Sequence, residues 1–342
     1  MLNSPKKQQG IALITVLMIL AIMVTIASTM TGRLTLSLKR TEGLIFSQSV
    51  YWYGQAAGDF GRMVLNQDFS DSEVVSLDQN WALPEMAFPL ENGSIAGEFK
   101  DLRSCFNVNT LGHRKKGEDD DDNNEDNDGI DKDTISVTAL EQYQALLEAI
   151  GINDYVAEII AGSTRDWIDK DDENNTAQGA EDSFYQARAV SHLAGNNLMV
   201  DVSELRAVQG VGQKVYERIS PYLCAIPTVK QKINVNTVKV EQAAILYALF
   251  KKKFDIPLAD FTTLLEGRPI SGWNNIEGFL ASSIFSDLII STEFKKQLSV
   301  TSEYFQLTGT AEFEDRTIAV QLLFKMDEKK AKVIRYQSGG LK

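Results

Sequence analysis

The sequence predicts an α+β protein in which one long N-terminal helix packs on an antiparallel sheet and a large helical domain is inserted between the strands. Three observations support this fold class. An uncharged apolar run covers residues 11–30, strand-like segments occur at 93–110 and again at 302–336, and the apolar residues between them have helical spacing. Strands from the two ends of the chain should therefore form one sheet, which makes the middle an insertion.

The apolar run follows a basic segment, Lys6-Lys7-Gln8-Gln9-Gly10. About 20 residues of helix rise roughly 30 Å, the thickness of the bilayer hydrocarbon core, so we expect a single-pass anchor. A secretory signal peptide would have a shorter apolar core with its cleavage site after the core. Here the glycine comes first, and residues 1–10 resemble a class III prepilin leader that prepilin peptidase cuts between Gly10 and Ile11. An ordinary anchor that happens to follow a glycine is the alternative.

Counting from Ile11, the fifth residue is Thr15. Most pilins carry a glutamate at this position, and its carboxylate is thought to pair with the N-terminal amine of the next-lower subunit. A chain without that carboxylate lacks the charge partner within the hydrocarbon that would draw it onto a neighbour below. The resemblance to prepilins therefore implies a subunit at the head of a fibre.

Beyond the membrane the helix is expected to continue to about Leu65, for a total length of roughly 80 Å. Apolar residues at spacings of three and four create a single apolar face on this extension, made of Phe46, Val50, Tyr53, Ala57, Phe60 and Val64. Glycines at 54, 58 and 61 should weaken the helix locally. The face suits packing on a sheet, and a juxtamembrane coiled coil is the alternative.

Short strand-like runs lie on both sides of the middle of the chain. The first pair covers residues 94–102 and 105–110, and the second group covers 302–307, 310–313, 317–324 and 332–336. Glu314-Asp315-Arg316 and Asp327-Glu328-Lys329 are turn signals between the later runs. These runs are expected to form the antiparallel sheet.

The composition suits a large exported domain. The chain has 342 residues, is 44% hydrophobic and has a formal net charge of -13. A negative balance argues against general nucleic-acid binding, because phosphate must be met by Lys and Arg. The two histidines, His113 and His192, do not lie beside a nucleophile or an acidic residue at the spacing of a catalytic motif, so no enzyme activity is expected.

Two cysteines, Cys105 and Cys224, both follow the anchor. In an oxidising compartment such a pair is more often bridged than free. A bridge would close a loop of about 100 residues and, in the chain-entropy model, stabilise the fold by up to roughly 4 to 5 kcal/mol. Two buried free thiols are the alternative.

The middle of the chain contains a weak internal repeat. Phe106-Asn107-Val108-Asn109-Thr110 recurs as Ile233-Asn234-Val235-Asn236-Thr237, each time before a segment with helical spacing. Because Asn and Thr are good N-cap residues, each phrase should open a helical subdomain. The predicted organisation is leader 1–10, membrane helix 11–30, first portion of the sheet domain 31–111, inserted helical domain with an acidic loop 112–227, second helical subdomain 228–297 and returning strands 298–342.

One acidic segment of the insertion has the composition of a calcium loop, with carboxylates alternating at positions 169, 171 and 173. Calcium takes six to eight oxygen ligands, and a divalent ion would relieve the repulsion among such carboxylates. The segment does not match an EF-hand, because its sixth position is Asn174 instead of glycine and the closing carboxylate falls one residue late. We therefore expect a calcium site of another kind, with a solvated acidic turn as the alternative. The expected ligands are Asp169, Asp171, Glu173, Glu181 and Asp182, with Asp166 and Asp172 as further candidates.

A second acidic stretch covers residues 118–133. Asp126, Asp128 and Asp131 surround Gly129 and are also candidates for calcium binding, although so dense an acidic run is usually a solvated loop. Both interpretations stay open. The loop from residue 113 to 133 lacks aromatic residues and is expected to be disordered or ordered by ions.

Residues 203–219 resemble a helix-hairpin-helix, in which two short helices are joined by Gly210-Val211-Gly212. In repair enzymes and competence proteins this unit presents backbone amides to DNA phosphate. Here the chain is acidic and the helix after Thr237 has no second Gly-x-Gly hairpin, so we expect a packing scaffold and no nucleic-acid partner. A membrane-anchored DNA-uptake receptor is the competing function.

Several motifs together identify a family. In chain order they are Gly10-Ile11, Thr15 in place of glutamate, Asp101-Leu102, Phe106-Asn107-Val108-Asn109, Asp166-Trp167-Ile168-Asp169, Gly179-Ala180-Glu181-Asp182, Ser203-Glu204-Leu205 and Ser302-Glu303-Tyr304-Phe305. Their order and spacing over nearly the whole chain resemble the minor pseudopilin K family of type II secretion, also called general secretion pathway protein K.

The resemblance implies a pilin-like fold with a SAM-like or helix-hairpin-helix insertion that binds calcium. It implies cleavage by prepilin peptidase, methylation of the new N-terminus, and a single pass through the inner membrane with the C-terminal domain in the periplasm. It also implies a complex with minor pseudopilins I and J. Because a large insertion would clash with subunits stacked above it, we expect a subunit that caps and initiates the pseudopilus and is placed to contact secreted cargo. A type IV pilus minor pilin is a further alternative.

Overall fold

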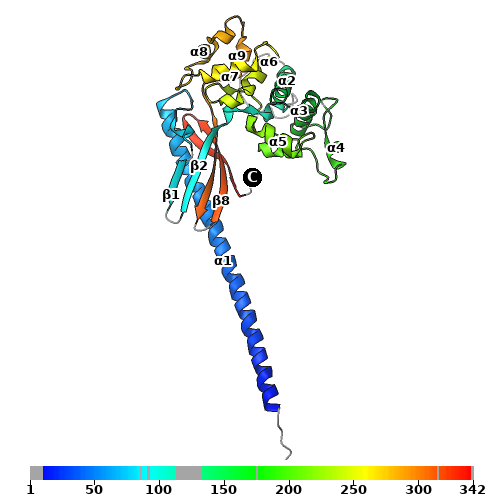
Figure 1. Cartoon of the computed structure of the whole chain (residues 1–342), viewed down its shortest axis with the longest axis vertical. Helices are drawn as coiled ribbons and strands as arrows, with labels where there is room; N and C mark the ends of the chain where they lie inside the picture. The colour runs from blue at the N-terminus through cyan, green and yellow to red at the C-terminus, as the bar shows by residue number, and fades with distance from the viewer. Residues whose placement is uncertain are drawn as a thin grey trace, which may run out of the picture.

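The structure is a computed structural model that describes residues 11–84, 86–90, 93–112, 132–174, 176–313 and 316–339. It has a long N-terminal helix, a sheet packed on the upper half of this helix, and a helical insertion at the end of the sheet farther from the start of the helix (Figure 1). This arrangement confirms the predicted α+β fold class.

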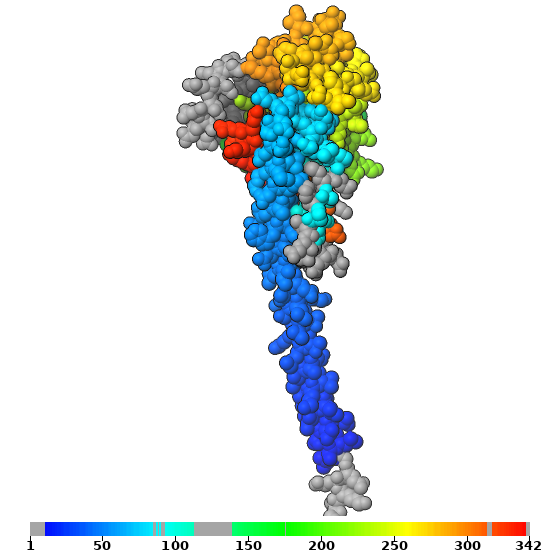
Figure 2. Space-filling model, turned by 90° about the vertical axis from the view of Figure 1, so that its left-hand side faces the viewer, coloured from blue at the N-terminus to red at the C-terminus, as the bar shows by residue number. Residues whose placement is uncertain are grey.

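The N-terminal helix α1, Ile11–Asp71, has 61 residues and is about 90 Å long. The described side chains of residues 11–45 are all exposed, and this half stands clear of the rest of the molecule in Figure 2. Among the residues that the structure describes, α1 is the one helix long and apolar enough to cross a membrane. It extends past the predicted end at Leu65 because Phe69 continues the buried face.

Three glycines of α1 allow the helix to lie close to the sheet. Gly54, Gly58 and Gly61 are all buried, and a Cβ atom at Gly61 would lie 2.5 Å from Cζ of Phe324. A Cβ at Gly54 would overlap the ring of Tyr336. The sequence predicted that these glycines only weaken the helix, whereas in the structure they make room for aromatic rings of the sheet.

The sheet has five strands in the order β1-β2-β7-β8-β9, and every neighbouring pair is antiparallel. The strands are β1 Met86–Leu90, β2 Gly93–Asp101, β7 Tyr304–Phe313, β8 Arg316–Asp327 and β9 Lys330–Ser338. Asp101 of β2 lies opposite Phe305 of β7, so strands from the two ends of the chain are neighbours, as predicted. Alternate residues, such as Phe99 and Phe324, pack with α1 in one core.

Three details of the sheet differ from the sequence prediction. β1 was not predicted. The runs 302–307 and 310–313 are one strand, because Gly309 lies opposite Gly97 and the ladder continues through it. The run 105–110 leaves the sheet and forms β3, Phe106–Asn107, and the 3-10 helix η3, Val108–Leu111.

The predicted turn between the last two strands is present. Glu328 and Lys329 connect β8 to β9 with φ angles of 47° and 65°. A two-residue β-hairpin loop with a type I′ turn requires positive φ at both residues, because this turn matches the twist of the strands.

The insertion occupies the chain between β2 and β7 and has a core of its own. Its α-helices in the described residues are α2 Lys132–Ala149, α3 Asp154–Ile168, α4 Asp182–Gln186, α5 Gln213–Ile219, α6 Ala244–Lys251, α7 Leu258–Glu266, α8 Ile276–Leu280 and α9 Thr292–Lys295, and its 3-10 helices include η4 Val202–Ala207, η5 Ser220–Tyr222, η6 Val240–Gln242 and η7 Ser283–Phe285. Residues 102–111, which the sequence grouped with the sheet domain, contribute Leu102, Phe106, Val108 and Leu111 to this core.

The repeated phrase has the same local structure in both halves of the insertion. β3 pairs in parallel with β4, Leu223–Cys224, and β5, Ile233–Asn234, pairs in parallel with β6, Leu298–Ser299. In each half the phrase precedes a pair of helices in contact, α2 with α3 and α6 with α7, and α2 packs on α6 between the halves.

The second asparagine of each phrase holds a distant piece of backbone. Asn109 Oδ1 accepts from the amide of Met199 at 2.7 Å, and Nδ2 donates to the carbonyl of Met199 at 2.9 Å. Asn236 clamps the backbone of Trp273 in the same way, at 2.8 and 3.0 Å. Capping, the role predicted from sequence, is performed by Asn107 at the start of η3.

The chain leaves the sheet and returns to it around one buried carboxylate, Asp101. Its Oδ2 accepts from Ser302 Oγ at 2.6 Å, Thr237 Oγ1 at 2.5 Å and Asn234 Nδ2 at 3.2 Å, and its Oδ1 accepts from the amide of Arg103 at 2.7 Å. Burial raises the pKa of Asp101, and these hydrogen bonds oppose the rise. The carboxylate ties the sheet to the second half of the insertion.

A disulfide joins Cys105 to Cys224, whose Cα atoms lie 5.7 Å apart and whose sequence separation is 119. Cys105 precedes β3 and Cys224 lies in β4, so the bridge links the parallel pair that closes the first half of the insertion. At the corresponding positions the second half has Lys232 and Ser299, so its ladder is held by hydrogen bonds.

We predict that Asp101→Ala lowers the free energy of unfolding by about 3 to 5 kcal/mol, because three buried side-chain donors lose their common acceptor. Urea unfolding of the full chain in detergent, followed by circular dichroism, measures the change. Asp327→Ala is the control, since this exposed carboxylate forms a surface ion pair with Lys332 and its removal should leave stability unaltered. A loss below about 1 kcal/mol for Asp101→Ala would contradict the assigned role.

We further predict that the double variant Cys105→Ser, Cys224→Ser is less stable by about 4 to 5 kcal/mol, the chain-entropy value for a loop of this length. Urea midpoints of the variant and of the oxidised wild type give the difference, and reduced wild type should match the variant. Two titratable thiols in the denatured, unreduced protein would show that the bridge does not form.

Candidate metal centre

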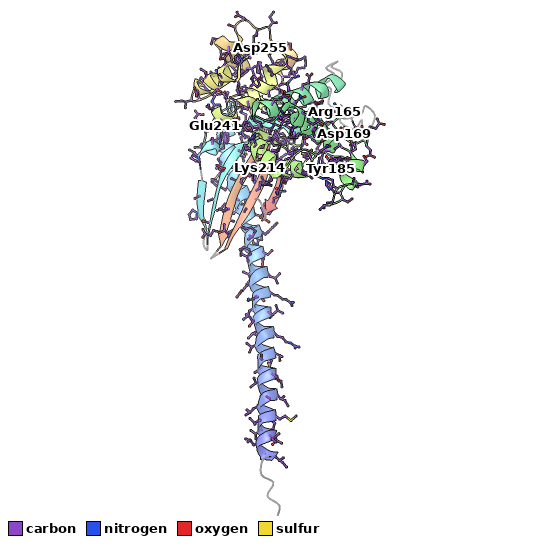
Figure 3. All side chains as sticks on the ribbon, turned by 45° about the vertical axis from the view of Figure 1, so that its right-hand side comes forward. Arg165, Asp169, Tyr185, Lys214, Glu241 and Asp255 are labelled. Atoms are coloured by element: carbon purple, nitrogen blue, oxygen red, sulfur yellow. A yellow bond between two sulfur atoms is a disulfide. The ribbon has the colours of Figure 1, made fainter. Side chains whose placement is uncertain are left out.

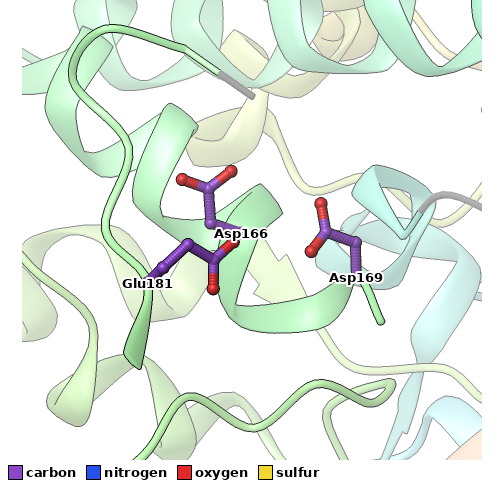
Figure 4. A group of neighbouring side chains, drawn as sticks. All are labelled: Asp166, Asp169 and Glu181. Atoms are coloured by element: carbon purple, nitrogen blue, oxygen red, sulfur yellow. The ribbon is translucent and has the colours of Figure 1, made fainter. Parts of the chain in front are cut away.

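Three acidic side chains from two segments of the insertion meet at the end of α3. Asp166 and Asp169 are three residues apart and therefore lie on the same side of the helix, and Glu181 approaches from the segment that precedes α4. One carboxylate oxygen of each lies within 4.8 Å of the others. Figure 4 shows the three carboxyl groups gathered beside the last turn of the helix.

Two glycines allow the loop after α3 to fold back onto the helix. A Cβ atom at Gly179 would overlap the carboxylate of Asp166, and a Cβ at Gly162 would overlap the hydroxyl of Thr176. The loop therefore passes so close to α3 that only hydrogen fits at these positions. This return brings Glu181 to the two aspartates.

The three carboxylates are buried, which distinguishes them from a solvated acidic turn. Asp166, Asp169 and Glu181 have exposed fractions of 0%, 1% and 3%. Both carboxylate oxygens of Glu181 are buried with no hydrogen-bond partner among the described residues. Burial, followed by the charges of Asp166 and Asp169, raises the pKa of Glu181 to about 8.

The set of converging residues differs from the predicted set. Asp169 and Glu181 were among the five expected ligands, and Asp166 was a further candidate. Asp171 and Glu173 lie outside the group in a turn, where the Asp171 carboxylate accepts from the amide of Glu173 at 3.1 Å. Asp171 and Glu173 do not join the group because α3 continues to Ile168 and places Asp169 beside Asp166, while the residues after Asp169 follow an exposed turn. The helical spacing of Asp166 and Asp169 is the signal in the sequence that could have placed these two residues together.

The remaining candidates have other contacts or lie elsewhere. Asp182 accepts from the amide of Ala194 at 2.8 Å, and Asp172 accepts from Nδ2 of Asn196 at 3.2 Å. Asp126, Asp128 and Asp131 lie outside the described residues.

The donor set suits a hard cation. All three groups offer carboxylate oxygen, the ligand that Ca²⁺ and Mg²⁺ prefer, whereas zinc and copper sites use histidine or cysteine. Neither oxygen of Glu181 has a hydrogen-bond partner among the described residues, and a divalent ion would supply one and offset the close approach of the three carboxylates. Three carboxylates leave several calcium positions for backbone oxygens and water.

The helix-hairpin-helix forms and packs against α3, the helix that carries Asp166 and ends just before Asp169. η4 starts with a capping box between Asp201 and Glu204, and α5 follows the glycine turn. Gly210 has a φ of 84°, and a Cβ there would lie 2.9 Å from Cγ1 of Ile160 in α3. The hairpin turn thus contacts protein, as the predicted packing role requires.

Comparisons with known proteins agree on one family. Models of the type II secretion system protein K family match residues 104–228 and 233–301. The chain is 37% identical over 341 residues to type II secretion system protein K of Aeromonas hydrophila, covering 98% of this chain and 99% of the relative. It is 32% identical to the corresponding protein of Pectobacterium carotovorum subsp. carotovorum, covering 98% and 97%.

The fold is also similar to a solved structure, described as the crystal structure of the GspK-GspI-GspJ complex from the enterotoxigenic Escherichia coli type 2 secretion system. The TM-score is 0.73 at 31% identity, and the match covers 88% of this chain and 99% of that chain. The chain therefore belongs to the type II secretion system protein K family.

Proposed function

We propose that this minor pseudopilin caps and initiates the type II secretion pseudopilus, and that it acts by assembly with other subunits instead of by catalysis. The position of the insertion carries the proposal. In Figure 1 helices α6 to α9 lie beyond the end of the sheet opposite the free half of α1, with α3 to α5 beside that end, and Figure 3 places Asp255 at the far end. A subunit stacked above along the fibre would occupy the same space, so the top position alone accommodates the domain.

The membrane half of α1 supports the same position. The hydroxyl of Thr15, which stands where most pilins have glutamate, donates to the carbonyl of Ala12 at 2.9 Å in its own helix. Thr15 is thus satisfied without a partner in the membrane, whereas a carboxylate there would need one. After cleavage at Gly10 the free amine of Ile11 remains available to the glutamate of another subunit.

The proposed partners are minor pseudopilins I and J. The solved complex to which this fold is similar contains GspK, GspI and GspJ. We place the anchor in the inner membrane and the sheet and insertion in the periplasm, where an oxidising environment maintains the Cys105–Cys224 bridge. Prepilin peptidase would remove residues 1–10, and the exposed distal end is the region placed to meet secreted cargo.

We also propose that Asp166, Asp169 and Glu181 bind calcium. Three observations support this assignment: the burial of all three groups, the lack of a partner for either Glu181 oxygen among the described residues, and the all-oxygen donor set. The ion would join the end of α3 to the start of α4. Its role is structural, since it stabilises a loop of one half of the insertion.

Assembly is tested by coexpressing the full chain with minor pseudopilins I and J and purifying the complex with and without a chelator. We predict a complex of the three proteins and, in gold-labelled fibres, label on this subunit at one end only. Label at many successive levels would contradict capping. Binding of the chain to DNA below micromolar concentration at physiological salt would instead favour an uptake receptor.

For the metal, we predict that Glu181→Gln and Asp169→Asn each weaken calcium binding at least about tenfold, because each removes a buried charged ligand. Isothermal titration of the full chain in detergent measures the affinity. Glu173→Gln is the matched control, because it removes the same charge from an exposed residue in the same loop. Equal losses for Glu181→Gln and Glu173→Gln would show that the ion binds diffusely to the acidic loop.

A further inference from the structure

Residues 187–200 follow α4 and form neither helix nor strand, so their shape depends on contacts with neighbouring segments of the insertion. At the far end of this segment, Asn109 clamps the backbone of Met199. The middle of the segment is held by the residues between α3 and α4, which include Asp169 and Asp172, and by Asp182 at the start of α4. Figure 3 places Asp169 of this loop and Tyr185 of α4 on the flank of the insertion, away from α1.

Two carboxylates next to the metal centre hold the middle of the segment. Asp182, the residue after Glu181, accepts from the amide of Ala194 at 2.8 Å. Asp172, three residues after Asp169, accepts from Nδ2 of Asn196 at 3.2 Å. Both acceptors are thus attached by short stretches of chain to residues whose positions the cation would fix.

An aromatic contact links the same two segments. Trp167, the neighbour of Asp166, packs edge-on against Tyr185 of α4 with ring centroids 5.2 Å apart. His192 of the segment lies on this pair, 5.1 Å from Tyr185 and 6.0 Å from Trp167. A Cβ at Gly195 would lie 2.7 Å from Nε1 of Trp167, so the segment passes directly over the indole.

The close approach of three buried carboxylates is the reason these contacts depend on a cation. Without one, three carboxyl groups lie within 4.8 Å of one another, and neither oxygen of Glu181 has a hydrogen-bond partner among the described residues to hold it in this place. Asp166 lies in α3, and Asp169 caps the helix with its amide bonded to the carbonyl of Arg165, so the stretch that carries Glu181 is the one that would shift. Moving that stretch displaces Asp182 and the start of α4, and with them the acceptor for Ala194 and the ring of Tyr185.

We propose that cation binding at Asp166, Asp169 and Glu181 orders residues 187–200, and that Asp182 is the positioning residue that transmits it, not a ligand. The inference rests on the proposed metal site and adds its consequence for the surface. The segment carries Val190, Leu193 and Val200 with exposed fractions of 80%, 56% and 58%. The cation would therefore determine whether the backbone that carries these exposed apolar side chains is ordered.

The test combines calcium titration with hydrogen exchange of the full chain in detergent. In wild type, saturating calcium should slow exchange of peptides from residues 188–200 at least about tenfold. Asp182→Ala should keep calcium affinity within about threefold of wild type while losing this protection, because the backbone amide of Ala194 has no acceptor. Asp182→Asn, which keeps an acceptor oxygen, should restore the protection. Glu181→Gln should lose both binding and protection.

The outcomes separate the two proposals. If wild type binds no calcium, the metal site fails and this inference fails with it. If wild type binds calcium and exchange of the segment is unchanged, the site stands and the coupling is wrong. A loss of affinity of more than about tenfold in Asp182→Ala would make Asp182 a ligand and overturn its role as a positioning residue.

Discussion

The insertion can keep a fixed position on the sheet because its exit and its return share one buried carboxylate. Asp101 is the last residue of β2. Its carboxylate accepts hydrogen bonds from Thr237 and Asn234, in the repeat at residues 233–237, and from Ser302 just before β7. Removing a carboxylate from water is costly, and several donors offset that cost only when all are in place. The sheet, the second phrase and the returning strand must therefore adopt their positions together.

Much of the fold could be predicted because periodicity and turn chemistry are local. The apolar face of α1 and the turn at Glu328 and Lys329 depend on residues close in sequence. β1 and the departure of residues 106–111 from the sheet could not be predicted, since they depend on partners far along the chain. Phe106 has strand-like neighbours, but its pairing partner is Leu223, and its ring stacks on Tyr143. Tertiary contacts outweighed local propensity there.

The sequence was sufficient to predict that carboxylates of this segment form a candidate metal centre, but not which of them converge. Carboxylates at 169, 171 and 173 suggested a loop in which alternate residues face one ion, as in known calcium loops. In the structure the carboxylates that converge are instead two at a helix end, where the period is close to four, and one from the segment that Gly179 brings back to the helix. Gly179 is part of the sequence motif, but its role depends on a tertiary contact, because the space for its Cβ atom is taken by the carboxylate of Asp166.

The order of connections along the molecule shows how a bulky helical domain can be held in a fixed position relative to the N-terminal helix. α1 packs closely on the sheet because its buried glycines leave room for aromatic rings of the strands. Asp101 joins the sheet to the second half of the insertion. The first half is closed by the Cys105–Cys224 bridge and contacts β9 through Arg335 and Asp201, 3.4 Å apart. A force applied to α1 in the membrane would thus reach the distal domain through packed helices, ladders and buried hydrogen bonds. Since the sheet holds both ends of the insertion, the domain and the helix should move as one unit.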